Sequence, residues 1–441
     1  MPTLEPLTLN DVDYEVEKRA ADTVLVVTTD SHGRLAGTRV FADSFLRDVV
    51  PSGLRMPAHL LCTDATGSLA TGYPLSNPAT GLRDLRARVD QKSMFRMPWL
   101  AGTIGALTDV EFLDGTAVTM APRTLLRRQV QRLEDASMTP SVGAEVQFTL
   151  LDGTDAAAPL PGAGQLVGPA SAAEKVLSRA RRLLSEVPVR LSATSGLVSA
   201  GGYELTLSPS TAMRTCDEVV LVRSALTAIA RDEGLHATFM PSYDSGLATA
   251  LHLSLTVRGT RGTAPFADHY GEGSLSETGK SFVAGILAHA PEVFLLYAPS
   301  VNAYRRFGAD VVTPRRLDWG SDNRTCAIRT VDDNGAVRIE NRLPGSDANP
   351  HLVLAAMIAS GLDGYGHQLP LQPQTATGDD APALPTSLAQ AVDLWADSAW
   401  VRETFGAEVQ EHYTVMGRLE AMAARAGADI SWERQRYLDM F

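Results

Sequence analysis

Apolar and polar positions alternate in the first part of the chain, and this pattern predicts a small sheet. The segments DTVLVVTTD (22–30) and GRLAGTRVF (33–41) have the alternation and the β-branched residues of strands, with the turn signal SHG between them. A further strand pair is predicted at 102–118, where GTIGALTDV and TAV flank a glycine turn. The chain therefore begins with a β-rich unit.

Strands and helices alternate through the rest of the chain. A helix begins at Pro122, since proline is favoured in a first helical turn. The helix that follows TCD has Asp217 as its expected N-cap and Gly234 as its stop. The other elements are predicted as strands 143–151, within 188–207, 236–241 and 250–257, and as helices 172–186, 217–233, from 350 onward, 386–396 and 403–426. Without a regular βαβ repeat, these elements predict an α+β fold with many antiparallel strands.

Length and charge limit the possible functions. At 441 residues the chain is too long for one ordinary core, and we expect an N-terminal domain at 1–112 and a larger domain at 113–441. The balance of 51 acidic to 39 basic residues gives a net charge of -12, which argues against a nucleic-acid surface.

Targeting signals and cysteine usage favour the cytoplasm. No apolar run reaches the length needed to span a bilayer, and the N-terminus lacks the basic start and apolar centre of a signal peptide. The three cysteines, Cys62, Cys216 and Cys326, are scattered without metal-ligand spacing. We therefore expect a cytoplasmic protein that does not bind membranes or nucleic acid.

Charged residues interrupt three apolar strand patterns. Glu145 lies two residues before Gln147 on one strand face, and Glu204 follows two glycines that allow a close approach. In VRIENRLPG, Arg338, Glu340 and Arg342 alternate on one face. Taken singly, each pattern also fits a surface strand with cross-strand ion pairs.

Arginines concentrate near the third of these strands. Those within one span of forty residues include Arg305, Arg306, Arg324, Arg329, Arg338 and Arg342. Carboxylates that hold divalent metals, facing arginines that hold phosphates, are what phosphoryl transfer requires. The chain has no GxxxxGK[ST] loop and no GxGxxG, so a nucleotide would be bound in another way.

An ordered series of motifs resembles the glutamine synthetase family over nearly the whole chain. The motifs are GAEVQF, GGYEL, GLHATFMP, HLSL, SVNAYRRF, WGSDNRTCAIR, RIENRLPGSDANPHL and SGLDGYG. The segments GTRVFADSFL and APRTLLRRQV are most similar to the γ-glutamyl-amine branch, whose members join amines other than ammonia to glutamate. The resemblance implies a small β-grasp-like N-terminal domain and a catalytic domain built on an antiparallel β-sheet funnel with surrounding helices. It also implies self-association into rings, often dodecamers.

The resemblance also implies a metal site, which this chain matches only in part. The family holds two metal ions, and the matching ligands here are Glu145, Glu204 and Glu340. Three companion positions carry Gln147, Gly196 and Ala250 instead. The match places His252 and Ser254 on the nucleotide side, although a shift of two residues would make His252 the metal ligand. We expect ATP and Mg²⁺ or Mn²⁺, with fewer ions than usual in the family.

Other positions match the substrate and phosphate contacts of the family. Arg324, Arg329 and Arg338 match arginines that contact phosphate, and Arg306 and Arg342 match those that hold substrate carboxylates. The match assigns catalytic roles to Arg306, Arg324, Glu340, Arg342 and Asp84, the last as the aspartate that orients the incoming amine. Val312 stands where the family has a flap glutamate, which argues against plain glutamine synthesis.

Two hypotheses follow from this partial match. The first is an ATP-dependent carboxylate–amine ligase that forms an amide through an acyl phosphate, with a non-ammonia amine or an altered acid as substrate. The second is a catalytically inactive relative with a regulatory or structural role, because three of six metal positions have changed. A third possibility is an enzyme that phosphorylates a different substrate. Six other histidines are expected to have no chemical role: His236, His269, His289, His351, His367 and His412.

Overall fold

A computed structural model describes most of the chain. The described residues are 5–153, 158–161, 172–198, 201–244, 246–268, 275–307, 312–333, 335–374, 381–424 and 428–441. His269 lies outside them. The N-terminal elements are α1 (Leu9–Glu17), β1 (Thr23–Thr29), β2 (Leu35–Phe41), α2 (Ala42–Ser44), α3 (Val50–Ser52), β3 (Leu54–Pro57), β4 (Asp84–Arg96) and β5 (Thr103–Glu111).

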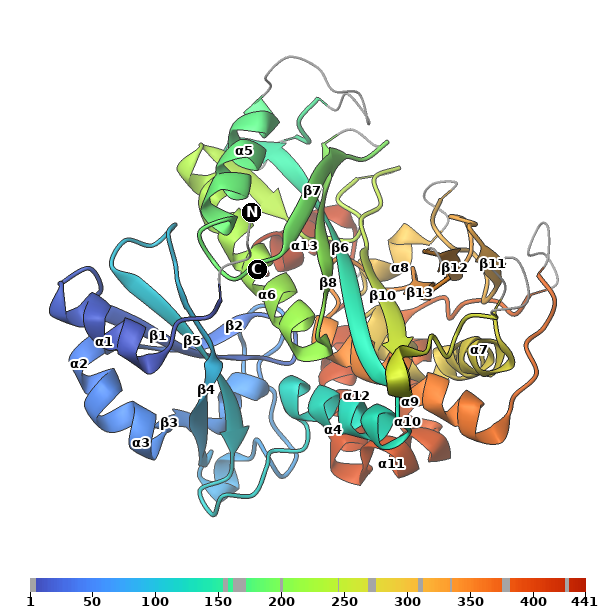
Figure 1. Cartoon of the computed structure of the whole chain (residues 1–441), viewed down its shortest axis with the longest axis horizontal. Coiled ribbons are helices and arrows are strands. Elements are labelled where there is room, and N and C mark those ends of the chain that lie inside the picture. Colours follow the sequence, from blue (N-terminus) through green and yellow to red (C-terminus); the bar gives the residue numbers. More distant parts are fainter. Residues whose placement is uncertain are drawn as a thin grey trace.

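The N-terminal elements form a five-stranded sheet in the order β2-β1-β5-β4-β3 (Figure 1). Its central pair, β1 and β5, is parallel, and the other pairs are antiparallel. The prediction of a strand pair at 102–118 is wrong in its second half. Residues 116–118 form no named strand, and a single bridge from Glu111 to Ala117, with backbone hydrogen bonds from Phe112 to Thr116 and from Val118 to Val110, closes the turn. The domain boundary at 112/113 stays a prediction.

The rest of the chain forms a second sheet with surrounding helices (Figure 1). Its strands are β6 (Thr139–Asp152), β7 (Leu191–Gly196), β8 (Gly202–Ser210), β9 (Leu235–Thr238), β10 (Leu251–Arg258), β11 (Trp319–Ser321), β12 (Ile328–Asp332) and β13 (Val337–Asn341). The helices are α4 (Pro122–Asp135), α5 (Ala172–Leu184), α6 (Ala212–Asp232), α7 (Glu277–Tyr297), α8 (Ala303–Arg306), α9 (Pro350–His367), α10 (Leu388–Asp397), α11 (Ala399–Phe405), α12 (Ala407–Ala423) and α13 (Ile430–Tyr437).

The second sheet confirms the expected antiparallel funnel. Its order is β11-β12-β13-β10-β6-β8-β7, with β9 also paired to β6, and it curves until it is nearly closed. The pairs along β6, β8, β10 and β13 are all antiparallel. The predicted α+β class is therefore correct.

Alternation along β6 gives this sheet two different faces. Ala144, Val146 and Phe148 are buried, and β6 packs on α4 and α6. Glu145 and Gln147 project from the opposite face, as a strand period of two requires. The apolar residues therefore anchor the strand, and the same geometry delivers two polar side chains to the far face.

The predicted N-cap at Asp217 is wrong. Helix α6 begins one turn and a half earlier, after Thr211 as the N-cap residue, and Asp217 lies inside it. Its carboxylate contacts Arg123 and His351. Arg123 is almost fully buried and also bonds Asp90 and Asp109, so the acid at 217 belongs to an ion cluster that joins distant segments. The stop was predicted correctly, since Gly234 has the positive φ of a helix end.

Helices α7 and α9 cross at glycines that leave no room for a side chain. A Cβ built on Gly285 would lie 2.2 Å from the carbonyl oxygen of Ser360, and one on Gly364 would lie 2.2 Å from that of Ser281. Real Cβ atoms do not come this close to backbone. The two backbones therefore touch directly, and this contact fixes the C-terminal part of α9 against α7.

The C-terminal helix α13 packs on residues near α8 and β9 of the same chain. Glu433 is fully buried and accepts hydrogen bonds from Asn302 and Arg305. Tyr437 and Met440 pack into a separate apolar cluster beside β9 and β6. Arg305 is therefore part of this packing, and α13 holds the turn that leads into α8.

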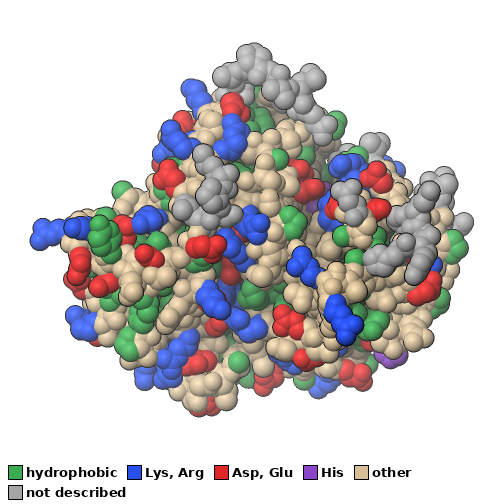
Figure 2. Space-filling model, viewed as in Figure 1, with side chains coloured by type: hydrophobic (Ala, Val, Ile, Leu, Met, Phe, Trp, Pro, Cys, Tyr) green, Lys and Arg blue, Asp and Glu red, His purple; other side chains and the backbone are tan. Residues whose placement is uncertain are grey.

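Surface charge is mixed on the face shown in Figure 2, where Lys and Arg are interspersed with Asp and Glu. None of the helices in the described parts of the chain has both the length and the apolar character that crossing a membrane would need.

Candidate active site

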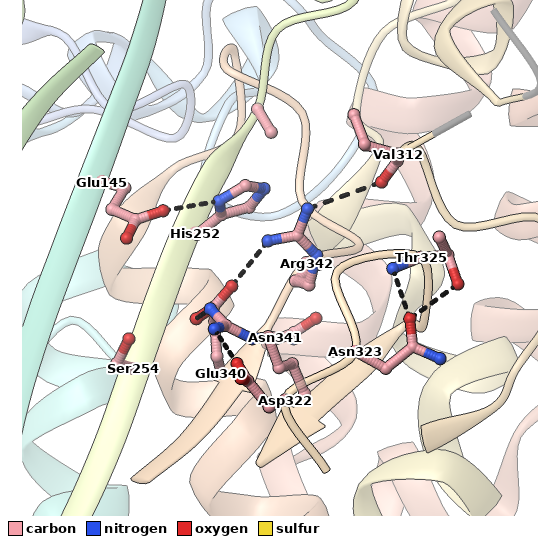
Figure 3. A network of polar contacts seen from close by, with 12 residues as sticks. Glu145, His252, Ser254, Val312, Asp322, Asn323, Thr325, Glu340, Asn341 and Arg342 are labelled. Atoms are coloured by element: carbon pink, nitrogen blue, oxygen red, sulfur yellow. Dashed lines mark hydrogen bonds and ion pairs between the residues drawn. The ribbon is translucent and has the colours of Figure 1, made fainter. Parts of the chain in front are cut away.

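Strand register brings three possible metal ligands together on the polar face of the second sheet. Glu145 on β6 lies directly across from His252 on β10, and Gln147 lies across from Glu204 on β8. Glu145, Glu204 and His252 each offer a ligand atom, and these atoms lie within 4.8 Å of one another. The Nδ1 atom of His252 is 3.0 Å from Oε2 of Glu145 (Figure 3). We call these three residues the trio.

Burial and neighbouring charges give the trio unequal proton affinities. Burial opposes ionisation of Glu145, but the hydrogen bond with His252, the interaction with its charged form and the charge of Arg342 outweigh burial and lower the pKa of Glu145 to about 2. Burial raises the pKa of Glu204 to about 7, and the negative charge of Glu145 adds to this effect. Burial and then Arg342 lower the pKa of His252 below 6.5. Both effects favour the neutral imidazole, which is the form that binds metals.

The donor set of the trio fits a divalent cation. Two carboxylates supply two negative charges when Glu204 is ionised, and a neutral imidazole supplies a third ligand atom. The structure thus groups His252 with Glu145 and Glu204, whereas the family match placed it on the nucleotide side. At the companion position, Ala250 contributes only its backbone, which bonds Gln147. Residues 250, 252 and 254 lie on one strand face, so the sequence alone did not decide which of them approaches Glu145. The register of β10 against β6 shows that it is His252.

Ser195, rather than Gly196, faces Glu204. On β7, Ser195 is the register partner of Glu204, while Gly196 pairs with Tyr203 on the other face of the sheet. The match of Gly196 to a family metal position stays a prediction. Neither residue is acidic, so the hairpin adds no carboxylate beside Glu204.

Glu340 is enclosed by arginines. Its carboxylate is fully buried and lies 2.6 Å from Arg342, 3.2 Å from Arg329 and 3.5 Å from Arg338. Ser254 is its register partner on β10 and accepts a hydrogen bond from Arg338. The assignment of Glu340 as a metal ligand stays a prediction, because in this structure its charge is balanced by guanidinium groups (Figure 3).

The remaining arginines differ in what they can reach. Arg306 is buried and donates to the carbonyl oxygens of Arg342 and Leu343, so it fixes the chain after β13. Arg324 is exposed and makes no hydrogen bond or ion pair with the described residues, although its charge acts on Glu204. Arg342 also donates to the carbonyl oxygen of Val312.

Arg329 and Asp84 are the last two predicted residues to be located in the structure. Arg329 forms an ion pair with Asp322, an exposed acid that the sequence patterns did not single out. Asp84 lies at the exposed start of β4 in the N-terminal sheet, across from Pro57, and it is not part of the polar face that carries the trio. Its proposed role with the amine stays a prediction.

Comparison with known proteins agrees with this architecture. The family of the glutamine synthetase catalytic domain matches residues 119–437. Gamma-glutamylethanolamide synthetase GlnA4 of Streptomyces coelicolor is 34% identical over 445 residues, which cover 98% of this chain and 96% of that protein. Glutamate–isopropylamine ligase of a Pseudomonas species is 30% identical over 448 residues and covers 96% of each chain.

The solved structure of GmaS in complex with ADP has the same fold. It superposes with a TM-score of 0.82 at 24% identity and covers 98% of this chain and 100% of its own. The matched family spans most of the chain, and the two curated relatives confirm the resemblance to the γ-glutamyl-amine branch. The chain therefore belongs to the glutamine synthetase family.

Proposed function

We propose that the protein is an ATP-dependent ligase that joins an amine other than ammonia to the side-chain carboxylate of glutamate or a related acid. The observation that carries this proposal is the placement of the trio and the arginines around Glu340 on one face of one sheet. The names of the relatives support it, since they describe the joining of ethanolamine and isopropylamine to glutamate.

The side chains present suit the two steps of such a reaction. In the first step, a carboxylate oxygen takes the γ-phosphoryl group of ATP and ADP leaves. Arg324, Arg329 and Arg338 are proposed to hold the phosphate oxygens, because guanidinium groups neutralise charge that spreads over them. A divalent cation on the trio supplies further positive charge there when it is bound.

In the second step the amine nitrogen attacks the acyl carbon, phosphate leaves, and the nitrogen loses a proton. Arg342 is proposed to orient the acid, and Arg306 acts through it by holding its backbone carbonyl. Val312 offers no carboxylate at the position where the family carries a glutamate, so we expect ammonium to be a poor substrate. The compact donor set of the trio argues against the inactive alternative.

The test is a product assay on the purified chain with ATP, Mg²⁺, glutamate and pools of primary amines that include ethanolamine, isopropylamine and putrescine, with ammonium as a separate reaction. We expect phosphate release and, by mass spectrometry, an amide equal in mass to acid plus amine minus water. A His252→Ala variant should lose both signals because the trio loses a ligand. Nucleotide binding without phosphate release across broad amine and acid pools would overturn the proposal.

A further inference from the structure

The side-chain amide of Gln147 has one chemically allowed orientation. Its Oε1 atom lies 2.9 Å from the backbone nitrogen of Ala250, and its Nε2 atom lies 2.9 Å from Oε2 of Glu204. A backbone N–H can only donate, so the atom facing Ala250 must be the oxygen. The backbone nitrogen of Gln147 also donates to the carbonyl oxygen of Ala250 at 3.0 Å. The amide is therefore held at both ends.

This orientation presents a donor where a second cation would need an acceptor. The Nε2 group has no lone pair for a metal, and it occupies one oxygen of Glu204. The oxygen of Gln147 already accepts from Ala250, so turning it toward a cation would leave a buried N–H without a partner. Ser195, across from Glu204, carries no charge. This side of the trio therefore lacks the ligands for another ion.

The opposite side of the trio is closed for a different reason. Glu340 is a further buried carboxylate on this face, across from Ser254 on β10, and three guanidinium groups surround it. A bare cation placed there would meet like charge from Arg342 and Arg329. Among the described residues, the trio is also the single group with metal-ligand spacing. Its two carboxylates balance one divalent ion.

We propose that this centre holds one divalent cation per chain, and that Gln147 is the positioning residue that directs Glu204 toward that cation and excludes a second. The inference rests on the proposed function, since it assumes that the trio binds the metal of the ligase. It departs from the two-metal centre that the family resemblance implies. At position 147, a neutral amide that is hydrogen-bonded to Glu204 thus stands where the family resemblance implies a charged metal ligand.

The experiment measures Mn²⁺ binding to the full native chain without nucleotide, by equilibrium dialysis and by electron paramagnetic resonance. We expect one tight Mn²⁺ per chain, with the spectrum of an isolated ion. The Gln147→Glu variant should bind two, with the broadening of a close Mn²⁺ pair. Gln91→Glu is the matched control, because Gln91 is exposed on β4 in the N-terminal sheet, and it should still bind one.

A second variant tests the positioning role if Gln147→Glu does not fold. Gln147→Leu removes the hydrogen bond to Glu204, and Mn²⁺ affinity should fall about 10- to 100-fold, as when a ligand loses its supporting partner. Unchanged affinity in this variant, one ion in a folded Gln147→Glu, or two ions in the native chain would each overturn the inference while leaving the ligase proposal in place. A native chain that binds no Mn²⁺ would overturn both.

Discussion

Two of the histidines that contact carboxylates, His252 and His289, have opposite properties. His252 in the trio engages Glu145 through one nitrogen, and its other nitrogen has no partner among the described residues. His289 on α7 uses both nitrogens, with Glu292 at 2.6 Å and Asp363 at 2.8 Å, and its ring stacks on Trp400 with centroids 3.7 Å apart. The second histidine therefore has no lone pair to offer.

Neighbouring charge explains why the two rings differ in pKa. Burial acts against the charged form of both rings, and at His252 the charge of Arg342 adds to it, so the pKa is lowered. At His289 two carboxylates outweigh burial and the pKa is raised. His289, with both nitrogens bound by acids and its ring stacked on Trp400, joins helices α7, α9 and α11, and its charged form is favoured. A neutral histidine with an unused nitrogen can be a metal ligand.

The largest expected effect is a difference in metal binding between the trio and the His289 cluster, which consists of His289, Glu292 and Asp363. In Glu145→Gln the trio loses an anionic ligand. Mn²⁺ affinity should fall by more than about 100-fold, because the loss of a residue that only supports a ligand already costs up to that much. Glu292→Gln is the control beside His289 and should leave Mn²⁺ affinity unchanged. Titration calorimetry measures both. A fall of less than tenfold in Glu145→Gln would contradict the assignment of the trio.

The next effect separates the clusters by stability. In Asp363→Asn, His289 loses a charged partner, and the free energy of unfolding at pH 6 should fall by about 1.5–3 kcal/mol, as expected for a hydrogen bond to a charged group. His367 also lies near Asp363 but is exposed, so His367→Gln should cost less than about 0.5 kcal/mol. Urea unfolding measures both. Equal losses of unfolding free energy in the two variants would contradict the expectation that the partly buried contact of Asp363 with His289 is stronger than its exposed contact with His367.

The smallest effect is a pH dependence confined to the His289 cluster. Because the folded pKa of His289 is raised, its stabilisation is fully present below 6.5 and is lost as pH rises through the folded value. The pKa values of Glu292 and Asp363 are lowered, so their contribution is lost only in acid. The difference in unfolding free energy between wild type and His289→Gln should therefore be larger at pH 6 than at pH 9. A difference in unfolding free energy that grows as pH rises would contradict a raised pKa of His289 in the folded protein.

Sequence patterns predicted much of the local structure. Period-two alternation placed Glu145 and Gln147 on one strand face, and the motif series identified the family and its funnel. Helix starts and stops marked by proline and glycine, such as Pro122 and Gly234, were also correct. These features depend on neighbours along the chain, which a sequence displays directly.

Long-range pairing could not be predicted in the same way. The helix start at Asp217 was wrong because that acid serves Arg123, far away in the chain. Register decided that His252 meets Glu145 and that Ser195 faces Glu204. For Glu340, the ion-pair alternative left open by the sequence describes the contacts seen in the structure. Each of these outcomes depends on which strands become neighbours.

The glycine crossing of α7 and α9 has a consequence for mutational scanning. Gly285 and Gly364 lie on helices and are not among the predicted site residues, yet their backbones leave no space even for a methyl group. A library screened for activity should therefore reject substitutions at these glycines as strictly as those at Glu145. Intolerance to mutation is therefore expected at two kinds of position in this protein: the proposed ligands of the trio, and the contact points between helices. A metal-binding assay would tell the two kinds apart.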